Sequence, residues 1–407
     1  CHDKSIKPHT YVLHQLDLGI CQTDSGGYLL NLAGNNHLLR GGPTAPRIED
    51  EDIEVLCAVV KDSPCIHEVD LRYNNLTDKS AQHIATMLKE CDSLVALNLM
   101  SNFFTKEAAR LIAESLHDNG ILKMLKMNGN KIGNEGGMSF AAMLQINAGL
   151  EILDLNDCDL GMESVLALAT VLRQNKFITS LDVGRPLLFS VQEETTVHMG
   201  LMLRVNTVLK ELHLTKYGMG DFGAERLAEG LYDNNTLKYL DLSNNRITRD
   251  GTAFLGKLLE RNQTLEVLQL DQNRLECQGA MTIAHSLMKN FSLVSLSVKR
   301  NQIKGPGLCE IAECMEVNRT LEKLYVWGNV FEQDACKAIK SLLDRMRLQK
   351  ENTDVVYFEA DGKISLSEQS HGTRTYYYYT PLYGPESKIN TMSLLHNDYS
   401  SPVVIAT

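Results

Sequence analysis

The chain has 407 residues, a formal net charge of −11 and 22% charged residues. This acidic balance disfavours a nucleic-acid backbone as the main partner, because phosphates are bound through an excess of Lys and Arg. No run of about 18 apolar residues occurs, so no segment is typical of a membrane-spanning helix.

Residues 1–65 are predicted to form an irregular N-terminal segment followed by a capping repeat. Tyr28 to Leu38 resembles a degenerate strand and turn. The run Gly41 to Pro46, which breaks regular secondary structure, follows it. Ile53 and Leu56 begin an apolar pattern with helical spacing. An atypical first repeat is expected, because the end of a solenoid must present a closed outer face.

The clearest pattern in the chain is a repeat that covers residues 237–264. Leu240 and Leu242 are two residues apart, so they point to one face of a strand. Asn245 follows at a turn, where its side chain can satisfy free backbone groups. An apolar stripe with helical spacing comes next, and Asn262 ends the helix. One such repeat cannot bury its apolar face alone, whereas stacked repeats share a continuous core.

The same pattern returns every 28 residues, with one longer interval, and predicts about ten repeats over residues 66–348. The strand-opening residues are Ile66, Leu94, Leu122, Leu150, Ile178, Leu209, Leu237, Leu265, Leu293 and Leu321. The turn residues are Asn74, Asn102, Asn130, Asn245, Asn273, Asn301 and Asn329, replaced elsewhere by Cys158, Pro186 and Tyr217. The helix-end residues are Asn119, Asn147, Asn175, Asn206, Asn234, Asn262, Asn290 and Asn318.

The period and the helix length resemble the ribonuclease-inhibitor-like leucine-rich repeat family. That resemblance implies an α/β horseshoe solenoid, with a parallel sheet on the concave face and helices on the convex face. The fifth repeat departs from the pattern, because Gly184 to Phe189 replaces the Asn turn and three residues are added. This insertion is either tolerated at the surface or a bulge that meets a partner.

Residues 349–407 are predicted to form a C-terminal hairpin and a tyrosine-rich tail. Asp361-Gly362 lies between two alternating segments, which is typical of a hairpin turn. Tyr376, Tyr377, Tyr378 and Tyr379 follow. Tyrosine combines a large apolar area with a polar tip, which suits a contact surface. The tail either packs on a partner or folds back on the C-terminal cap.

No motif in the sequence indicates catalysis, a metal or a cofactor, so we expect neither an enzyme nor a cofactor. The ten cysteines are scattered and lack the spacing of a zinc site. Their use as free thiols fits a reducing compartment.

The residues between the strand leucines are expected to face the open inner side of the sheet. Neighbours along such a row are close, because adjacent strands lie about 4.8 Å apart. A cluster with exposed aromatic and basic side chains is typical of a binding interface. The candidate partner-binding residues are an acidic group (Asp154, Asp157, Asp182, Asp241, Asp271), a basic and aromatic group (Lys299, Arg300, Lys323, Tyr325, Trp327) and the four tail tyrosines.

These features favour a non-catalytic scaffold or adaptor that binds one or more proteins within a larger assembly. Similarity to leucine-rich subunits of motile cilia implies a place in the ciliary axoneme, with the cytoplasm expected more generally and the nucleus as the alternative. The family also includes the GTPase-activating protein of Ran and ribonuclease inhibitor. Two alternatives therefore stay open, which are regulation of a small GTPase and binding of a basic protein.

Overall fold

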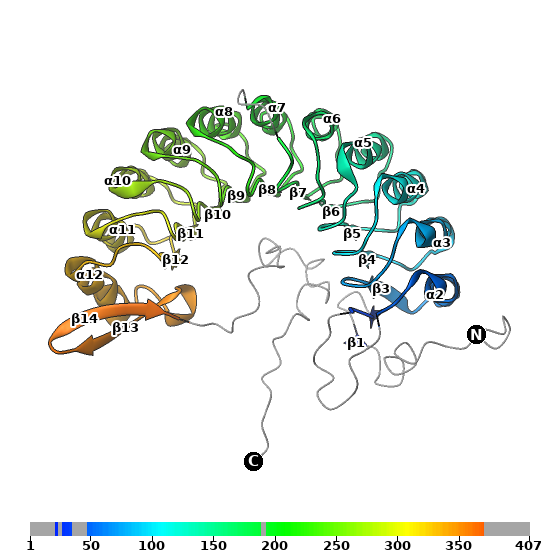
Figure 1. Cartoon of the computed structure of the whole chain (residues 1–407). Helices are drawn as coiled ribbons and strands as arrows, with labels where there is room; N and C mark the ends of the chain where they lie inside the picture. Colours follow the sequence, from blue (N-terminus) through cyan, green and yellow to red (C-terminus); the bar gives the residue numbers. More distant parts are fainter. Residues whose placement is uncertain (1–20, 23–26, 35–46, 189–192, 370–407) are drawn as a thin grey trace, which may run out of the picture. The chain divides into compact units, whose positions relative to one another are not determined.

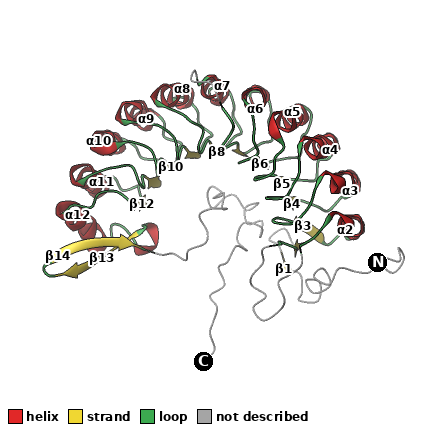
Figure 2. Ribbon diagram, viewed as in Figure 1, coloured by secondary structure: helices red, strands yellow, loops and turns green. Residues whose placement is uncertain are grey.

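The computed structural model describes residues 21–22, 27–34, 47–188 and 193–369. These residues fall into two compact parts, and the chain passes from one to the other between Leu187 and Leu188. We call them the N-terminal half and the C-terminal half and describe each by itself. Within each half, short strands line the inner side and helices the outer side (Figures 1 and 2).

The N-terminal half alternates strands and helices. Its elements are β1 (Cys21–Gln22), β2 (Tyr28–Asn31), α2 (Asp50–Asp62), β3 (Ile66–Asp70), α3 (Asp78–Glu90), β4 (Ala96–Asn98), α4 (Lys106–Leu116), β5 (Met124–Lys126), α5 (Gly133–Leu144), β6 (Ile152–Asp154), α6 (Met162–Leu172) and β7 (Ser180–Asp182). β1 pairs antiparallel with β2, and the strands from β2 to β7 pair in parallel. The strand and helix order of a repeat is therefore present at β2 and α2, ahead of Ile66.

The C-terminal half continues the alternation and ends in a hairpin. Its elements are α7 (Glu194–Leu203), β8 (Glu211–His213), α8 (Asp221–Leu231), β9 (Tyr239–Asp241), α9 (Arg249–Arg261), β10 (Val267–Gln269), α10 (Glu276–Leu287), β11 (Ser295–Ser297), α11 (Gly305–Val317), β12 (Lys323–Tyr325), α12 (Gln333–Asp344), η1 (Lys350–Asn352), β13 (Val355–Ala360) and β14 (Lys363–Glu368). β8 to β12 pair in parallel, and β13 pairs antiparallel with β14 across Asp361-Gly362.

The repeat leucines build the core between sheet and helices. Leu240 pairs with Leu268, which pairs with Leu296, so equivalent residues stack in register. All three are fully buried, as is Leu255 on the inner stripe of α9. The predicted α/β architecture, with parallel strands alternating with helices, is confirmed.

The turn asparagines tie each repeat to its neighbour. The Nδ2 of Asn273 donates to its own Leu270 carbonyl at 3.1 Å and to the Leu242 carbonyl of the preceding repeat at 3.0 Å. Its Oδ1 accepts the backbone N–H of Ile247 at 3.0 Å. Cys158 keeps one of these bonds, because its thiol donates to the Met127 carbonyl at 3.2 Å. This row explains the recurrence of Asn that the sequence shows.

A second row of asparagines fixes the other edge, where each helix returns to the next strand. The Nδ2 of Asn318 donates to the carbonyls of Leu287 and Asn290, 31 and 28 residues earlier. Its Oδ1 accepts the N–H groups of Thr320 and Leu321 at 2.8 Å. Asn234, Asn262 and Asn318 each begin an Asn-x-Thr sequence, the acceptor pattern of N-glycosylation. Because all three are buried and hydrogen-bonded in this way, the fold explains their recurrence.

The last parallel strand is capped by a buried carboxylate. Asp354 accepts the N–H of Val326 at 2.9 Å and that of Trp327 at 3.1 Å. In inner repeats the corresponding donor bonds the next strand, as Val298 does with the Tyr325 carbonyl. Asp354 thus satisfies groups that the end of the sheet would leave without partners.

Replacing Asp354 with Ala is expected to lower the free energy of unfolding by about 2 kcal/mol, because two buried N–H groups lose their acceptor. Burial raises the pKa of Asp354 above 3.8, although the N–H groups of Val326 and Trp327 oppose this. The folded state therefore binds the proton more tightly than the unfolded state. The contribution of Asp354 is largest below the unfolded pKa and shrinks as pH rises through the folded one.

Denaturant unfolding of wild type and Asp354→Ala at about pH 4 and about pH 7 checks both points. The variant should cost more stability at the lower pH. An equal or larger cost at neutral pH would contradict the assigned direction of the pKa shift.

Candidate functional site

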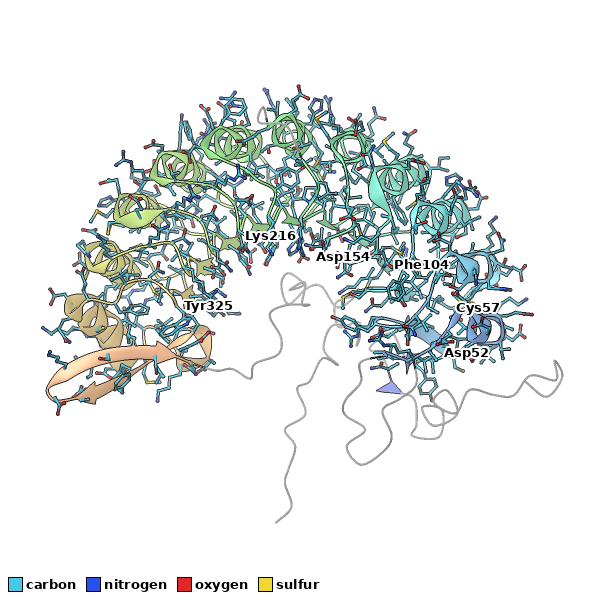
Figure 3. All side chains as sticks on the ribbon, in the orientation of Figure 1. Asp52, Cys57, Phe104, Asp154, Lys216 and Tyr325 are labelled. Carbon is cyan, nitrogen blue, oxygen red and sulfur yellow. The ribbon has the colours of Figure 1, made fainter. Side chains whose placement is uncertain are left out.

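The inner row of the N-terminal half places two predicted aspartates opposite each other. Asp154 on β6 pairs in register with Asp182 on β7, and Asp154 lies on the inner side of the ribbon (Figure 3). The side chain of Asn156 donates to Asp182 at 3.0 Å. Asp157 lies beside them at the turn, where it forms an ion pair with Arg185 at 2.9 Å. The structure therefore brings these three aspartates into one region.

Two of these carboxylates also accept hydrogen bonds from backbone N–H groups. Asp154 accepts the N–H of Asn156 at 3.0 Å, and Asp182 accepts the N–H of Gly184 at 2.8 Å. Residues Asp154 and Asp182 are 5% and 9% exposed. Asp241 and Asp271, in the C-terminal half, are buried as well. The expectation that this row is an openly exposed surface is wrong for these four aspartates, because strand-end hydrogen bonds and close neighbours enclose them.

Asp241 belongs to a buried cluster that the sequence patterns did not single out. His213 Nε2 lies 2.8 Å from Glu211 Oε1, and His213 Nδ1 lies 3.8 Å from Asp241 Oδ2. The ring of Tyr239 lies 4.8 Å from that of His213. Glu211 and His213 are two residues apart on β8 and so share a face, which is the signal that could have found the pair.

Asp271 connects the acidic group to the basic and aromatic group. It accepts hydrogen bonds from the Ser297 hydroxyl at 2.5 Å and the Lys299 N–H at 2.9 Å. The Lys299 Nζ lies 3.1 Å from its other oxygen. Burial raises the pKa of Asp271, and Lys299 and Ser297 partly offset this rise. Lys299 is thus held by Asp271 rather than extended toward a partner.

The most accessible part of the predicted site lies at β12. Lys323 and Arg300 are exposed, and Tyr325 and Trp327 are half-buried. Tyr325 lies on the inner side of the C-terminal half (Figure 3). The Arg300 N–H donates to the Trp327 carbonyl at 3.0 Å, so the two residues are neighbours. We call Arg300, Lys323, Tyr325 and Trp327, together with Phe331, the aromatic–basic cluster.

Phe331 is the member of this cluster that sequence reasoning missed. Its ring stacks on Trp327 with 5.8 Å between centroids. In earlier repeats the residue two positions after the turn Asn is a core residue, such as Phe104 or Ile303, and is fully buried. Phe331 belongs to the last repeat and stays half-buried. The repeat pattern alone assigns it to the core.

Several expectations concern features outside the described residues. Tyr376, Tyr377, Tyr378 and Tyr379 lie there, as does part of the fifth-repeat insertion, residues 189–192. Within the described ranges, no group of three or more His, Cys, Asp or Glu side chains is arranged to hold a metal ion. No helix in these ranges is long and apolar enough to cross a membrane.

Comparisons with known proteins place this geometry in a family. The leucine-rich repeat family matches residues 62–85, 122–141, 147–169, 233–255 and 289–312. Leucine-rich repeat-containing protein 34 of Rattus norvegicus is 54% identical over 92% of this chain and 89% of its own length. The chain belongs to the leucine-rich repeat-containing protein 34 family.

Relatives of the same name occur in other mammals. The Mus musculus protein is 48% identical and covers 92% of this chain and 89% of its own length. The Homo sapiens protein is 50% identical, over 94% of this chain and 83% of its own length. Among solved structures, leiomodin-1 actin-binding site 2 is similar at 25% identity and a TM-score of 0.33, over 38% of this chain and 89% of that one.

Proposed function

We propose that this protein is a non-catalytic scaffold that binds a partner protein through the aromatic–basic cluster. Leucine-rich repeats are protein-binding modules, and the family assignment supports this general role. The observation that carries the proposal is the stacked pair Trp327 and Phe331. Exposed Arg300 is hydrogen-bonded to the backbone of Trp327, and exposed Lys323 begins the strand that leads to it. Trp, Tyr and Arg are the residues that most often dominate binding energy at interfaces.

The surroundings of the cluster favour binding by a rigid surface. Asp354 holds the backbone of Trp327, and the Arg300 side chain lies over Gly328, where an added Cβ would meet Arg300 Cγ at 2.5 Å. Side chains that are ordered before binding lose less conformational entropy in a complex. The cluster is therefore organised for contact before a partner arrives.

Replacing Tyr325 and Trp327 together with Ala is expected to weaken partner binding by about 30-fold, since truncating an interface hot spot costs about 2 kcal/mol. Both side chains are partly exposed, so the fold should stay intact. The test is affinity purification of the tagged full chain, identification of the partner, and titration of purified proteins. Phe222→Ala, on the outer surface of α8, is the matched control. Unchanged affinity of the double variant would refute the assignment.

The two alternatives receive different support. A basic ligand, as for ribonuclease inhibitor, needs accessible carboxylates, and the burial of Asp154, Asp182 and Asp241 does not favour it. Regulation of a small GTPase makes a distinct prediction, because the purified chain would then stimulate GTP hydrolysis in a panel of such enzymes. Stimulation above background would replace the scaffold proposal.

We further propose that the scaffold acts in a large cytoplasmic assembly such as the ciliary axoneme. The support is the resemblance to leucine-rich subunits of motile cilia. Fluorescent tagging of the full chain in ciliated cells tests this location. Exclusion of the signal from the axoneme would remove the ciliary part and leave the binding proposal in place.

A further inference from the structure

A second surface lies on the return-loop edge of the C-terminal half, where each helix leads into the next strand. The three most exposed large hydrophobic side chains of the described residues are Phe291, Met346 and Val317, at 72%, 70% and 63%. Phe291 follows the helix-end Asn290, and Val317 precedes the helix-end Asn318. Val317 is the last residue of α11, and Phe291 and Met346 follow the ends of α10 and α12, so the three side chains lie at the C-terminal ends of three successive helices. Single exposed hydrophobic residues are ordinary, but such a row marks an interaction site.

Hydrogen bonds from side chains to backbone carbonyls connect these segments. The Nδ2 of Asn318 donates to the Asn290 carbonyl at 2.8 Å. Arg347 continues this row, because its guanidinium donates to the carbonyls of Asn318, of Leu321 at 2.7 Å and of Met315 at 2.7 Å. These bonds link the segments that carry the apolar side chains, which lowers the conformational entropy that a ligand would have to remove.

The apolar side chains on this edge have no packing role that explains them. Met346 has a φ of 56°, in the left-handed region that favours Gly or Asn at a helix end. A methionine that is 70% exposed there adds neither backbone freedom nor core packing. Methionine and phenylalanine are, however, adaptable and effective apolar contact residues.

Basic side chains flank the row. Arg319 is exposed, and the side chains of Lys289 and Arg345 are 67% and 68% exposed. Lys289 pairs with Glu260 at 2.9 Å and Arg345 with Glu316 at 3.4 Å. Surface pairs of this kind contribute little and can exchange for the carboxylates of a ligand. The three cations, two of which would exchange a glutamate of this chain for a carboxylate of the ligand, offer contacts to an acidic partner.

We propose that this edge binds an acidic amphipathic helix of a partner protein. Neighbouring repeats are spaced by roughly 5 Å at the strands and 10 Å at the helices, which corresponds to one or two turns of an α-helix. A helix laid along the row can therefore place apolar residues on Phe291, Val317 and Met346. Its glutamates and aspartates can reach Lys289, Arg319 and Arg345. This surface is separate from the aromatic–basic cluster and does not depend on it.

The test uses a fluorescent synthetic helix with leucines at positions i, i+3, i+4 and i+7 and glutamates elsewhere. The purified full chain should bind it, and the double variant Phe291→Ser, Met346→Ser should bind about tenfold more weakly. Arg319→Glu should weaken binding of the glutamate helix and strengthen binding of an otherwise identical helix that carries lysines in place of the glutamates. Phe222→Ser controls for loss of any exposed aromatic residue, and a thermal melt checks the fold of each variant.

Three results would overturn the proposal. The double variant could bind the glutamate helix as well as wild type does, or the lysine helix could bind wild type equally well. Sedimentation could instead show that the chain dimerises and that Phe291→Ser abolishes the dimer, which would make a second copy the occupant. Substitution of Tyr325 and Trp327 tests only the aromatic–basic cluster, so failure of one proposal is distinguishable from failure of the other.

Discussion

Replacing Asn262 with Ala is expected to lower the free energy of unfolding by about 4 kcal/mol. The side chain is 4% exposed and makes four hydrogen bonds. Its Nδ2 donates to the carbonyls of Leu231 at 2.8 Å and Asn234 at 2.7 Å. Its Oδ1 accepts the N–H groups of Thr264 at 2.8 Å and Leu265 at 2.9 Å. Alanine satisfies none of these buried groups, so each retains its desolvation cost.

Chemical denaturation followed by circular dichroism measures this loss, and hydrogen exchange at Thr264 and Leu265 locates it. Asn262→Asp keeps the acceptor but turns a carboxylate oxygen toward the carbonyls of Leu231 and Asn234, so at neutral pH its cost should be at least that of the alanine variant. The exposed Asn235 is the matched control, and Asn235→Ala should change stability by less than about 0.5 kcal/mol. A similar small effect at Asn262 would show that the asparagine row contributes little.

Replacing Gly230 with Ala is expected to cost about 3 kcal/mol, because α7 and α8 would have to separate. A Cβ at Gly230 would lie 2.1 Å from the Gly200 carbonyl oxygen and 2.7 Å from its carbon. These are backbone atoms, so no side chain can rotate away. The contact is reciprocal, since a Cβ at Gly200 would lie 2.4 Å from the Arg226 carbonyl oxygen.

The same denaturation experiment separates steric cost from the loss of glycine flexibility. Gly120 is the control, because a Cβ there meets nothing within 4 Å. Gly120→Ala should be neutral or stabilising by up to about 1 kcal/mol. If Gly230→Ala were also neutral, the close approach of α7 and α8 would not contribute to stability.

The fold was predictable because it depends on short patterns. Spacing of two between Leu240 and Leu242 defines the strand face, and the regular asparagines define both edges of a repeat. The contact between Gly200 and Gly230 was not predictable in this way. At the position of Gly230 the next repeats carry Leu258 and Ser286, so the pattern indicates only a helix position, not how closely two backbones approach.

The sequence predicted which residues lie on the inner side, but it did not predict how exposed each of them is. Sequence spacing places Tyr325 and Trp327 on the same inner side, and both are partly exposed. The same spacing cannot show that Asp182 accepts hydrogen bonds from Gly184 and Asn156, which encloses its carboxylate. It also cannot show that Phe331, at a core position by pattern, becomes accessible in the last repeat. Such differences arise from neighbours far apart in sequence.

The asparagine rows have a consequence for how this architecture can change in length. The side chain of Asn262 donates to the carbonyl of Asn234, and the side chain of Asn290 donates to the equivalent carbonyl of Asn262 one period later. After excision of residues 237–264, the side chain of Asn290 would meet the carbonyls of Leu231 and Asn234 in place of those of Leu259 and Asn262. Loss or gain of whole 28-residue repeats would therefore change the number of repeats and preserve the hydrogen bonds between them.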